Sequence, residues 1–369
     1  MLKIYYILIL NIFYINQVYA DLDFEDAAFP ELVTSARALA LGNAYICKVD
    51  DSWSAFYNPA GLGTVRKPSL HLGNFHLEGS NAYLKQVGTG PATDIPGNMS
   101  DSFDGQKTRE YLDENRGKIS HLRANIFPNF TMRGVTLGYF ASQRNRSYMD
   151  DVSATPTLEL DERRDHGPVF ALNGSFFGGV FKIGASAVYL IRRELQKDVL
   201  FNDPPVDIQD ADYKSGKMIL VTTGARLTLP FTFIPTLAAV VRNAANQKFD
   251  SPGTSGGVPD PIKQTVDVGF SITPQIGKIT RLHMEVNLKD LNNEYDTDIK
   301  RRSALGLELD FNRRIFLRAG SGDGWGSGGI GVRSRSFIFD FTTYAVDQSL
   351  DGFREKEDRR WVLSLSSGL

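Results

Sequence analysis

The feature that most constrains the fold is a strict alternation of apolar and polar residues, repeated along most of the chain. It runs from about Ser120 to the C-terminus. In TRLHMEVNLK (280–289) and QTVDVGFSI (264–272), for example, every second residue is apolar. Successive side chains of a β-strand point to opposite faces, so each such stretch predicts a strand with one apolar face.

The length of these stretches separates a soluble β-sandwich from a membrane barrel. Strands of globular proteins usually have about 5–6 residues, whereas a tilted strand that crosses a bilayer needs about 9–11, as most stretches here have. The links between them are alternately short and long, as they are in outer-membrane barrels. We therefore predict an all-β fold, an antiparallel transmembrane β-barrel.

The strand count follows from the short links. Two strands outside the hairpins are expected at about 68–86 and 359–369, which gives about fourteen strands in all. Pro, Gly and Asn in the links favour turns. The Gly-rich stretch 320–329 is interpreted as a loop. The hairpins are predicted at 120–143, 167–193, 216–247, 264–289, 301–320 and 325–346.

Charged residues on the strands indicate which face lines the lumen. A Lys or Arg that faces lipid at mid-bilayer costs roughly 2–4 kcal/mol, so charged positions should point inward. Both signs occur among them, which favours paired charges over an ion-selective pore. Lys182 and Arg226 belong to this set, and the main lumen-facing residues are predicted to be Asp267, Arg281, His283, Glu285, Glu308, Asp310 and Asp340.

The first twenty residues, MLKIYYILILNIFYINQVYA, have the pattern of an export signal. A positive residue precedes an apolar run, and small residues close it. We expect residues 1–20 to be a signal peptide and the protein to reside in a Gram-negative type outer membrane. The single cysteine, Cys47, excludes an internal disulfide and is interpreted as a packed small residue.

Residues 21–67 do not alternate and form a separate N-terminal segment. ELVTSARALALGNAYI has near-helical spacing of apolar residues, and DDSWSAFYNPAGLG combines aromatic residues with a turn. Fourteen strands enclose a lumen that wall side chains alone do not fill. We therefore predict a partly helical plug, or hatch, at 21–67 inside a barrel formed by 68–369.

The stretch SARALALGNAYICKVDDSWSAFYNPAGLG resembles the N-terminal signature of the FadL-type outer-membrane barrels. That superfamily includes long-chain fatty-acid transporters, hydrocarbon channels and PorV-like barrels of secretion systems. The resemblance implies a hatch that plugs the barrel, with either packing or ligand-binding roles for its signature residues. These candidates are Ser35, Arg37, Gly42, Asp50, Asp51, Trp53, Phe56, Tyr57, Asn58, Pro59 and Ala60.

Two functions of different classes remain open at this point. One is outer-membrane transport of hydrophobic, fatty-acid-like small molecules, gated by the hatch. The other is a PorV-like adaptor that binds another protein through long loops such as VLFNDPPVDIQDADYKSG. In strand one, the apolar phase changes around Gly73, which predicts a bulge or an opening of the wall.

The sequence offers little for other classes of function. No strongly basic character suggests a nucleic-acid partner, since the formal net charge is -2. The five histidines show no metal-ligand spacing, and no G-x-S-x-G nucleophile motif occurs. We expect no enzymatic activity, cofactor or metal site, and we expect membrane lipid and a hydrophobic ligand as partners.

Overall fold

The computed structural model describes residues 32–368 except 103, 152–155, 201–206, 251–255, 335 and 350–351. The predicted signal peptide and the first part of the predicted hatch lie outside these residues. The strands are β1 Ser69–Ser80, β2 Ser120–Ile126, β3 Asn129–Met132, β4 Val135–Met149, β5 Thr157–Phe176, β6 Phe181–Leu200, β7 Lys214–Thr228, β8 Thr236–Arg242, β9 Thr265–Ile272, β10 Thr280–Leu288, β11 Ser303–Phe311, β12 Ile315–Gly322, β13 Trp325–Arg333, β14 Phe337–Asp347 and β15 Glu357–Gly368.

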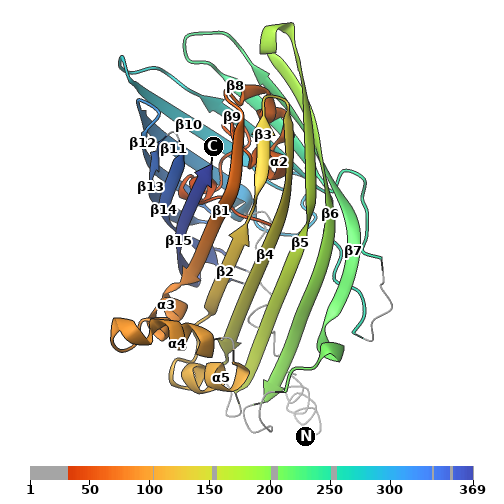
Figure 1. The fold of residues 1–369 in the computed structure, drawn as a ribbon, viewed down its shortest axis with the longest axis vertical. Helices are drawn as coiled ribbons and strands as arrows, with labels where there is room; N and C mark the ends of the chain where they lie inside the picture. The colour runs from red at the N-terminus through yellow and green to blue at the C-terminus, as the bar shows by residue number, and fades with distance from the viewer. Residues whose placement is uncertain are drawn as a thin grey trace, which may run out of the picture.

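These strands form one closed antiparallel barrel (Figure 1). β1 pairs with β15 along most of its length, which joins the first strand to the last. β2 and β3 both pair with β1 and β4, so they are two parts of one wall strand. The described segments therefore make fourteen wall strands, and the predicted fold class is confirmed.

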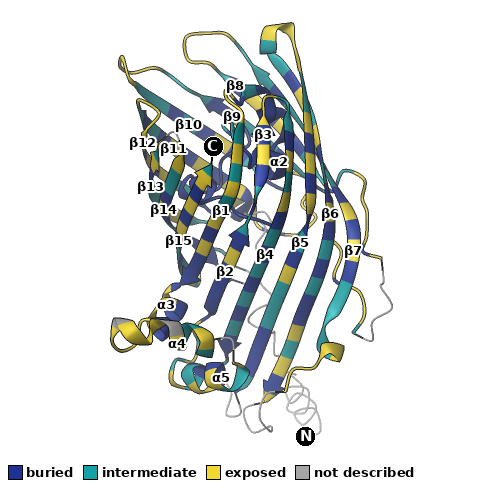
Figure 2. Ribbon diagram, in the orientation of Figure 1, coloured by how far each residue is buried: buried dark blue, intermediate teal, exposed yellow. Residues whose placement is uncertain are grey.

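The side chains alternate as the sequence pattern predicts. In β11, Leu305 and Leu307 are exposed on the outer face, whereas Glu308 and Asp310 are buried toward the lumen. Figure 2 shows the same alternation of buried and exposed bands along the other strands. Because every backbone group of a closed barrel has a neighbouring strand, this arrangement suits a lipid environment.

The wall is irregular where β2 gives way to β3. Pro128 lies between these strands and has no N–H to donate, so the hydrogen-bond ladder is interrupted there. On the facing strand, the register of β1 with β15 shifts between His71 and Gly73. The expected bulge near Gly73 is therefore present, and it lies beside the interruption.

Several strands are longer than predicted, whereas β1 and β8 are shorter. β4, β5 and β6 run into stretches that were expected to be loops, 143–165 and 194–215. Outside the bilayer no apolar face is required, so the polar composition there does not exclude a strand. β1 ends at Ser80 instead of near 86, because the Ser80 side chain accepts a hydrogen bond from Tyr83 N and starts helix α3.

The long connections gather at one end of the barrel, which we call the long-loop end, and the short turns lie at the opposite, short-turn end (Figure 1). None of the described helices has the length and apolarity needed to cross a membrane. Outside the N-terminal segment, the helices are α3 Asn81–Val87, α4 Ile95–Asp101, α5 Gly105–Glu114, α6 Ile299–Arg302 and the 3₁₀ turns η2 Ala92–Asp94, η3 Phe177–Gly179 and η4 Asp210–Asp212.

The interpretation of 320–329 as a loop is wrong. β12 continues to Gly322, the turn comprises only Asp323 and Gly324, and β13 begins at Trp325. Glycine is usually unfavourable in a strand, but here β12 packs against another part of the chain so closely that a side chain would not fit.

Candidate functional site

Residues 32–68, which we call the hatch, lie inside the barrel (Figure 1). The hatch contains α1 (Ala36–Ala40), α2 (Ser54–Tyr57) and the 3₁₀ helix η1 (Pro59–Thr64). α1 packs against β12 to β15, and η1 packs against β5, β6 and β7. The hatch therefore contacts the wall on opposite sides of the lumen. Almost every residue from 32 to 63 is buried.

Arg37 links α1 to the wall through a buried ion pair. Its Nε and Nη2 donate to the two carboxylate oxygens of Glu308 on β11, at 2.8 and 2.9 Å. Its Nη1 donates to Asp50 at 2.7 Å and to the hydroxyl of Tyr45 at 3.0 Å. Glu308 also accepts a hydrogen bond from Arg318 of β12 at 2.8 Å. Hatch and wall thus share one network of alternating charges.

The two adjacent acids of the hatch are not equivalent. Burial raises the pKa of Asp50, but the nearby Arg37 and Lys48 outweigh it and hold the pKa below its ordinary value. Burial, reinforced by the charge of Asp50, raises the pKa of Asp51 instead. Asp51 accepts hydrogen bonds from the hydroxyl of Tyr45 at 2.8 Å and from Trp53 N at 3.1 Å.

Asn58 and Pro59 pack closely against the wall at positions where the wall residues are glycines. The Asn58 side chain donates to Ile46 O at 2.9 Å and accepts from Ala60 N at 3.0 Å, which fixes the turn into η1. A Cβ on Gly224 of β7 would lie 2.1 Å from Asn58 Oδ1, and one on Gly184 of β6 would lie 2.4 Å from the carbonyl carbon of Pro59. Only glycine allows this approach.

A second close contact between the hatch and wall glycines lies on the other side of the lumen. Gly42, at the end of α1, has a φ of +61°, which favours glycine. A Cβ on Gly320 of β12 would lie 2.2 Å from the carbonyl carbon of Leu41, and one on Gly322 would lie 2.2 Å from Gly42 O. Gly320 and Gly322 were not selected from the sequence, because the Gly-rich stretch 320–329 was interpreted as a loop.

The hatch aromatics meet wall aromatics in an apolar cluster. The ring of Phe56 lies 5.1 Å from that of Phe127 and 5.7 Å from that of Phe140, both in edge-to-face arrangements. The ring of Trp53 lies 5.8 Å from that of Phe127. We call Trp53, Phe56, Phe127 and Phe140 the aromatic cluster; it belongs to a larger buried group that includes Val169.

The remaining hatch candidates have polar contacts within the lumen. Tyr57 is fully buried, and its hydroxyl accepts a hydrogen bond from Ser35 N at 3.2 Å. Ala60 is buried, and its carbonyl accepts a hydrogen bond from Asn173 of β5 at 3.2 Å. Cys47 is buried with a free thiol, and its N–H donates to Glu285 of β10 at 2.8 Å.

The other residues predicted to face the lumen are distributed among separate contacts. Asp267 binds Arg242 at 2.9 Å, and Arg242 in turn donates to Phe56 O. His283 contacts Glu285 at 2.9 Å. Asp310 accepts from the backbone of a turn. In the same set, Asp340 binds Arg318 at 2.5 Å, and Arg281 is only partly buried.

One buried polar cluster was not selected from the sequence. Glu78 of β1 lies 2.6 Å from His121 Nε2 and 2.6 Å from the hydroxyl of Tyr344. Thr34, near the start of the described hatch, lies 3.0 Å from His76 Nε2. The cluster fastens the hatch to β1, β2 and β14, and only the three-dimensional arrangement brings its members together.

Across the described residues, no group of three or more His, Cys, Asp or Glu side chains could hold a metal ion. The polar candidates bind one another or the wall, whereas the buried rings of the aromatic cluster pack against one another. A closed fourteen-stranded antiparallel barrel with a segment of chain packed in its lumen is the architecture of an outer-membrane β-barrel protein.

Comparisons with known proteins agree with this class at the level of the fold. No protein family model matches the chain, and no curated protein matches it. Among solved structures, the chain is similar to the CymD monoaromatic hydrocarbon channel, with a TM-score of 0.54 at 10% identity over 92% of this chain and 98% of that one. The likeness establishes a shared barrel fold. An outer-membrane barrel fold is what the N-terminal motif and the strand pattern led us to expect.

A second match is a Pseudomonas aeruginosa FadL homologue, at 9% identity over 93% of this chain and 99% of that one. Its TM-score is 0.31.

Proposed function

We propose that this protein transports hydrophobic small molecules across the outer membrane of a Gram-negative type cell, and that the hatch gates the path. The observation that carries the proposal is the aromatic cluster, where two hatch rings and two wall rings meet inside the barrel. Aromatic rings bind apolar molecules by burial and ring contacts. The fold shared with the CymD hydrocarbon channel supports the same class of function.

A groove in the outer wall supports a sideways route between lumen and membrane. It has a volume of about 660 Å³ and follows the wall interruption, with Leu70 and Leu72 of β1, Pro128 and Phe130 among its lining residues. Val169 of β5 lines the groove and also belongs to the buried group around the aromatic cluster. An opening of the wall at the bulge would therefore join the groove to this buried group.

Transport requires a second state of the protein that binds the ligand more weakly, and in this proposal a movement of the hatch produces it. Burial contributes about 0.8 kcal/mol per CH₂ group, so a long chain held against the aromatic cluster would leave slowly from one fixed state. A second hatch position that separates Trp53 and Phe56 from Phe127 and Phe140 would weaken binding. In this proposal, Trp53 and Phe56 are the hatch residues that contact the ligand. The other candidates position the hatch: Ser35, Arg37, Gly42, Asp50, Asp51, Tyr57, Asn58, Pro59 and Ala60.

The test is native mass spectrometry of the protein purified from its own membrane in mild detergent, followed by uptake of toluene and hexadecane into cells. We expect a bound small molecule that Phe56→Ala removes, together with slower uptake. Phe177→Ala is the matched control, because Phe177 is 82% exposed in the turn after β5. A gel that compares heated and unheated samples verifies that both variants form barrels.

Two results would contradict transport. One is unchanged uptake in Phe56→Ala cells that carry a correctly folded barrel. The other is a barrel that carries no small molecule and purifies with a second protein at a fixed ratio. That result would favour the PorV-like adaptor, whose partner would bind at the long-loop end.

A further inference from the structure

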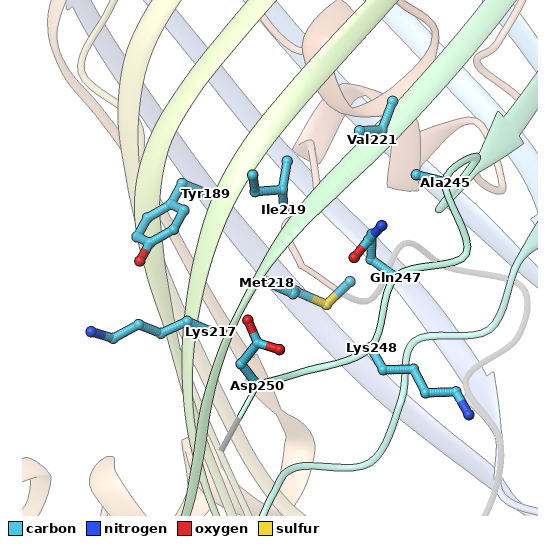
Figure 3. Close-up of a pocket in the computed structure, with 9 residues that line it drawn as sticks. All are labelled: Tyr189, Lys217, Met218, Ile219, Val221, Ala245, Gln247, Lys248 and Asp250. Atoms are coloured by element: carbon cyan, nitrogen blue, oxygen red, sulfur yellow. The ribbon is translucent and has the colours of Figure 1, made fainter. Parts of the chain in front are cut away.

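A second groove opens on the outer wall beside β7, nearer the long-loop end (Figure 3). It has a volume of about 430 Å³. One side is formed by β6 and β7, and the other by the chain that follows β8. Its lining residues are Tyr189, Lys217, Met218, Ile219, Val221, Ala245, Gln247, Lys248 and Asp250.

The groove exists because β8 is shorter than β7. β8 ends at Arg242, so it pairs with β7 only from Thr223 to Thr228. Beyond that, the chain contacts β7 at separate points: Ala244 N donates to Val221 O at 2.8 Å, and Asp250 exchanges two backbone hydrogen bonds with Lys217. The irregular segment 243–250 thus covers the edge of β7 without forming a continuous ladder.

Polarity changes along the groove in a definite order. Lys217, Ile219 and Val221 alternate along β7 and therefore share its outer face. Tyr189 of β6 is the register partner of Ile219. A cationic side chain thus lies toward the long-loop end and apolar side chains lie toward mid-membrane, which matches the order of headgroup and acyl chain in a membrane lipid.

The charges at the rim are unbalanced. Lys217 and Lys248 are both exposed, and among the described residues neither has an acidic side chain within ion-pair distance. The Asp250 carboxylate lies between them, while the two ammonium ends extend away from it on opposite sides (Figure 3). Two cations and one anion leave the rim with one net positive charge.

The apolar part of the groove continues along the wall. Tyr189 and Ile219 also line the 660 Å³ groove, together with Phe170 and Ala187. The two grooves therefore form one apolar track on the outer surface. An acyl chain that starts beside Lys217 can extend along this track toward the wall interruption.

We propose that this groove is a binding site for one phosphate-bearing, anionic lipid of the surrounding membrane. Its anionic headgroup lies at the rim that Lys217 and Lys248 make positive, and an acyl chain follows Ile219, Val221 and Tyr189. Asp250 opposes the negative headgroup and so limits the affinity.

Native mass spectrometry of the delipidated barrel with added phosphatidylglycerol or phosphatidylcholine tests the site. An exposed lysine contributes about 1 kcal/mol to attraction by anionic lipid, so Lys217→Gln and Lys248→Gln should each weaken phosphatidylglycerol binding about fivefold. Phosphatidylcholine binding should change less. Asp250→Asn should strengthen phosphatidylglycerol binding. Lys278→Gln is the matched control, since Lys278 is exposed in a turn at the short-turn end.

The apolar half of the site has its own variant. Val221→Trp fills the groove and should weaken both lipids, while the heated and unheated gel pattern verifies the barrel. The proposal is overturned if the two lysine variants bind phosphatidylglycerol like Lys278→Gln, or if they lose both lipids equally. It is also overturned if Asp250→Asn weakens the binding of phosphatidylglycerol.

Discussion

Arg37 of the hatch and Glu308 of β11 form a two-point ion pair, 271 residues apart in the chain, with N–O distances of 2.8 and 2.9 Å. Both side chains are almost completely buried. A parallel pair of charged hydrogen bonds fixes orientation as well as distance. This contact therefore sets where α1 lies relative to the wall.

Loss of this ion pair should loosen the hatch. Removal of one partner of a buried ion pair typically lowers stability by about 3–5 kcal/mol. The loss in Arg37→Met should lie near the lower limit, because Glu308 keeps its ion pair with Arg318. Cys47, the only cysteine, reports on the hatch: it is buried, and burial raises the pKa of its thiol. Arg37→Met should speed its reaction with a thiol reagent about a hundredfold or more.

Arg313→Met is the control for this experiment. Arg313 is exposed in the turn between β11 and β12, and substitutions of this kind usually change stability by less than about 0.5 kcal/mol. Equal labelling rates for the two variants would show that the ion pair does not hold the hatch.

A single methyl group on the wall should displace the hatch. In Gly320→Ala the new Cβ would lie 2.2 Å from the carbonyl carbon of Leu41, so α1 must shift. We expect faster labelling of Cys47 than in the unmodified protein. Gly326→Ala in the adjacent strand places its Cβ more than 4 Å from any neighbour and should leave the rate unchanged. Equally slow labelling of Cys47 in both variants would argue against close packing between Gly320 and α1.

The two adjacent acids should respond oppositely to pH. The pKa of Asp50 is depressed on folding, so its stabilisation is present above the unfolded value of about 3.9 and is lost as the pH falls through the folded value. Asp50→Asn should therefore destabilise the protein at pH 7, and this loss should shrink steadily as the pH falls below the unfolded pKa.

Asp51 has the opposite sign, because burial raises its pKa on folding. Its ionised form carries a cost at neutral pH that disappears below the unfolded pKa, so Asp51→Asn should be less destabilising at pH 7 than Asp50→Asn. Guanidinium unfolding of both variants across this pH range measures the difference. Parallel curves for the two variants would contradict the assignment.

The closed ladder between β1 and β15 should keep the barrel folded in detergent until it is heated. We expect unheated protein to migrate faster on a gel than heated protein, because the folded barrel is more compact. Identical migration would exclude a stable closed barrel.

Much of the wall was predictable from the sequence, because a period of two dictates strands with an apolar face. Leu305, Leu307, Glu308 and Asp310 show the reason: in a barrel in lipid, a charge on the outer face is costly, so the pattern also decides which side is the lumen. Strand ends were predicted less well. Beyond the membrane the apolar requirement disappears, and β5 and β6 continue there through polar sequence.

The hatch candidates were recognisable as a motif, but their partners were not. No local rule connects Arg37 to Glu308 or Asn58 to Gly224, since loop and strand geometry must first bring them together. The glycines of β12 look like a loop in the sequence because glycine weakens a strand. They lie in a strand because α1 approaches too closely for any side chain.

The sequence by itself determined a barrel of alternating strands and a separate N-terminal segment, because local periodicity and the cost of placing charge in lipid act on each strand independently. Only the tertiary structure decided where that segment sits, which charges pair across the lumen and where the wall is interrupted. Those features depend on contacts between residues far apart in the chain, which exist only once the barrel is closed around the hatch.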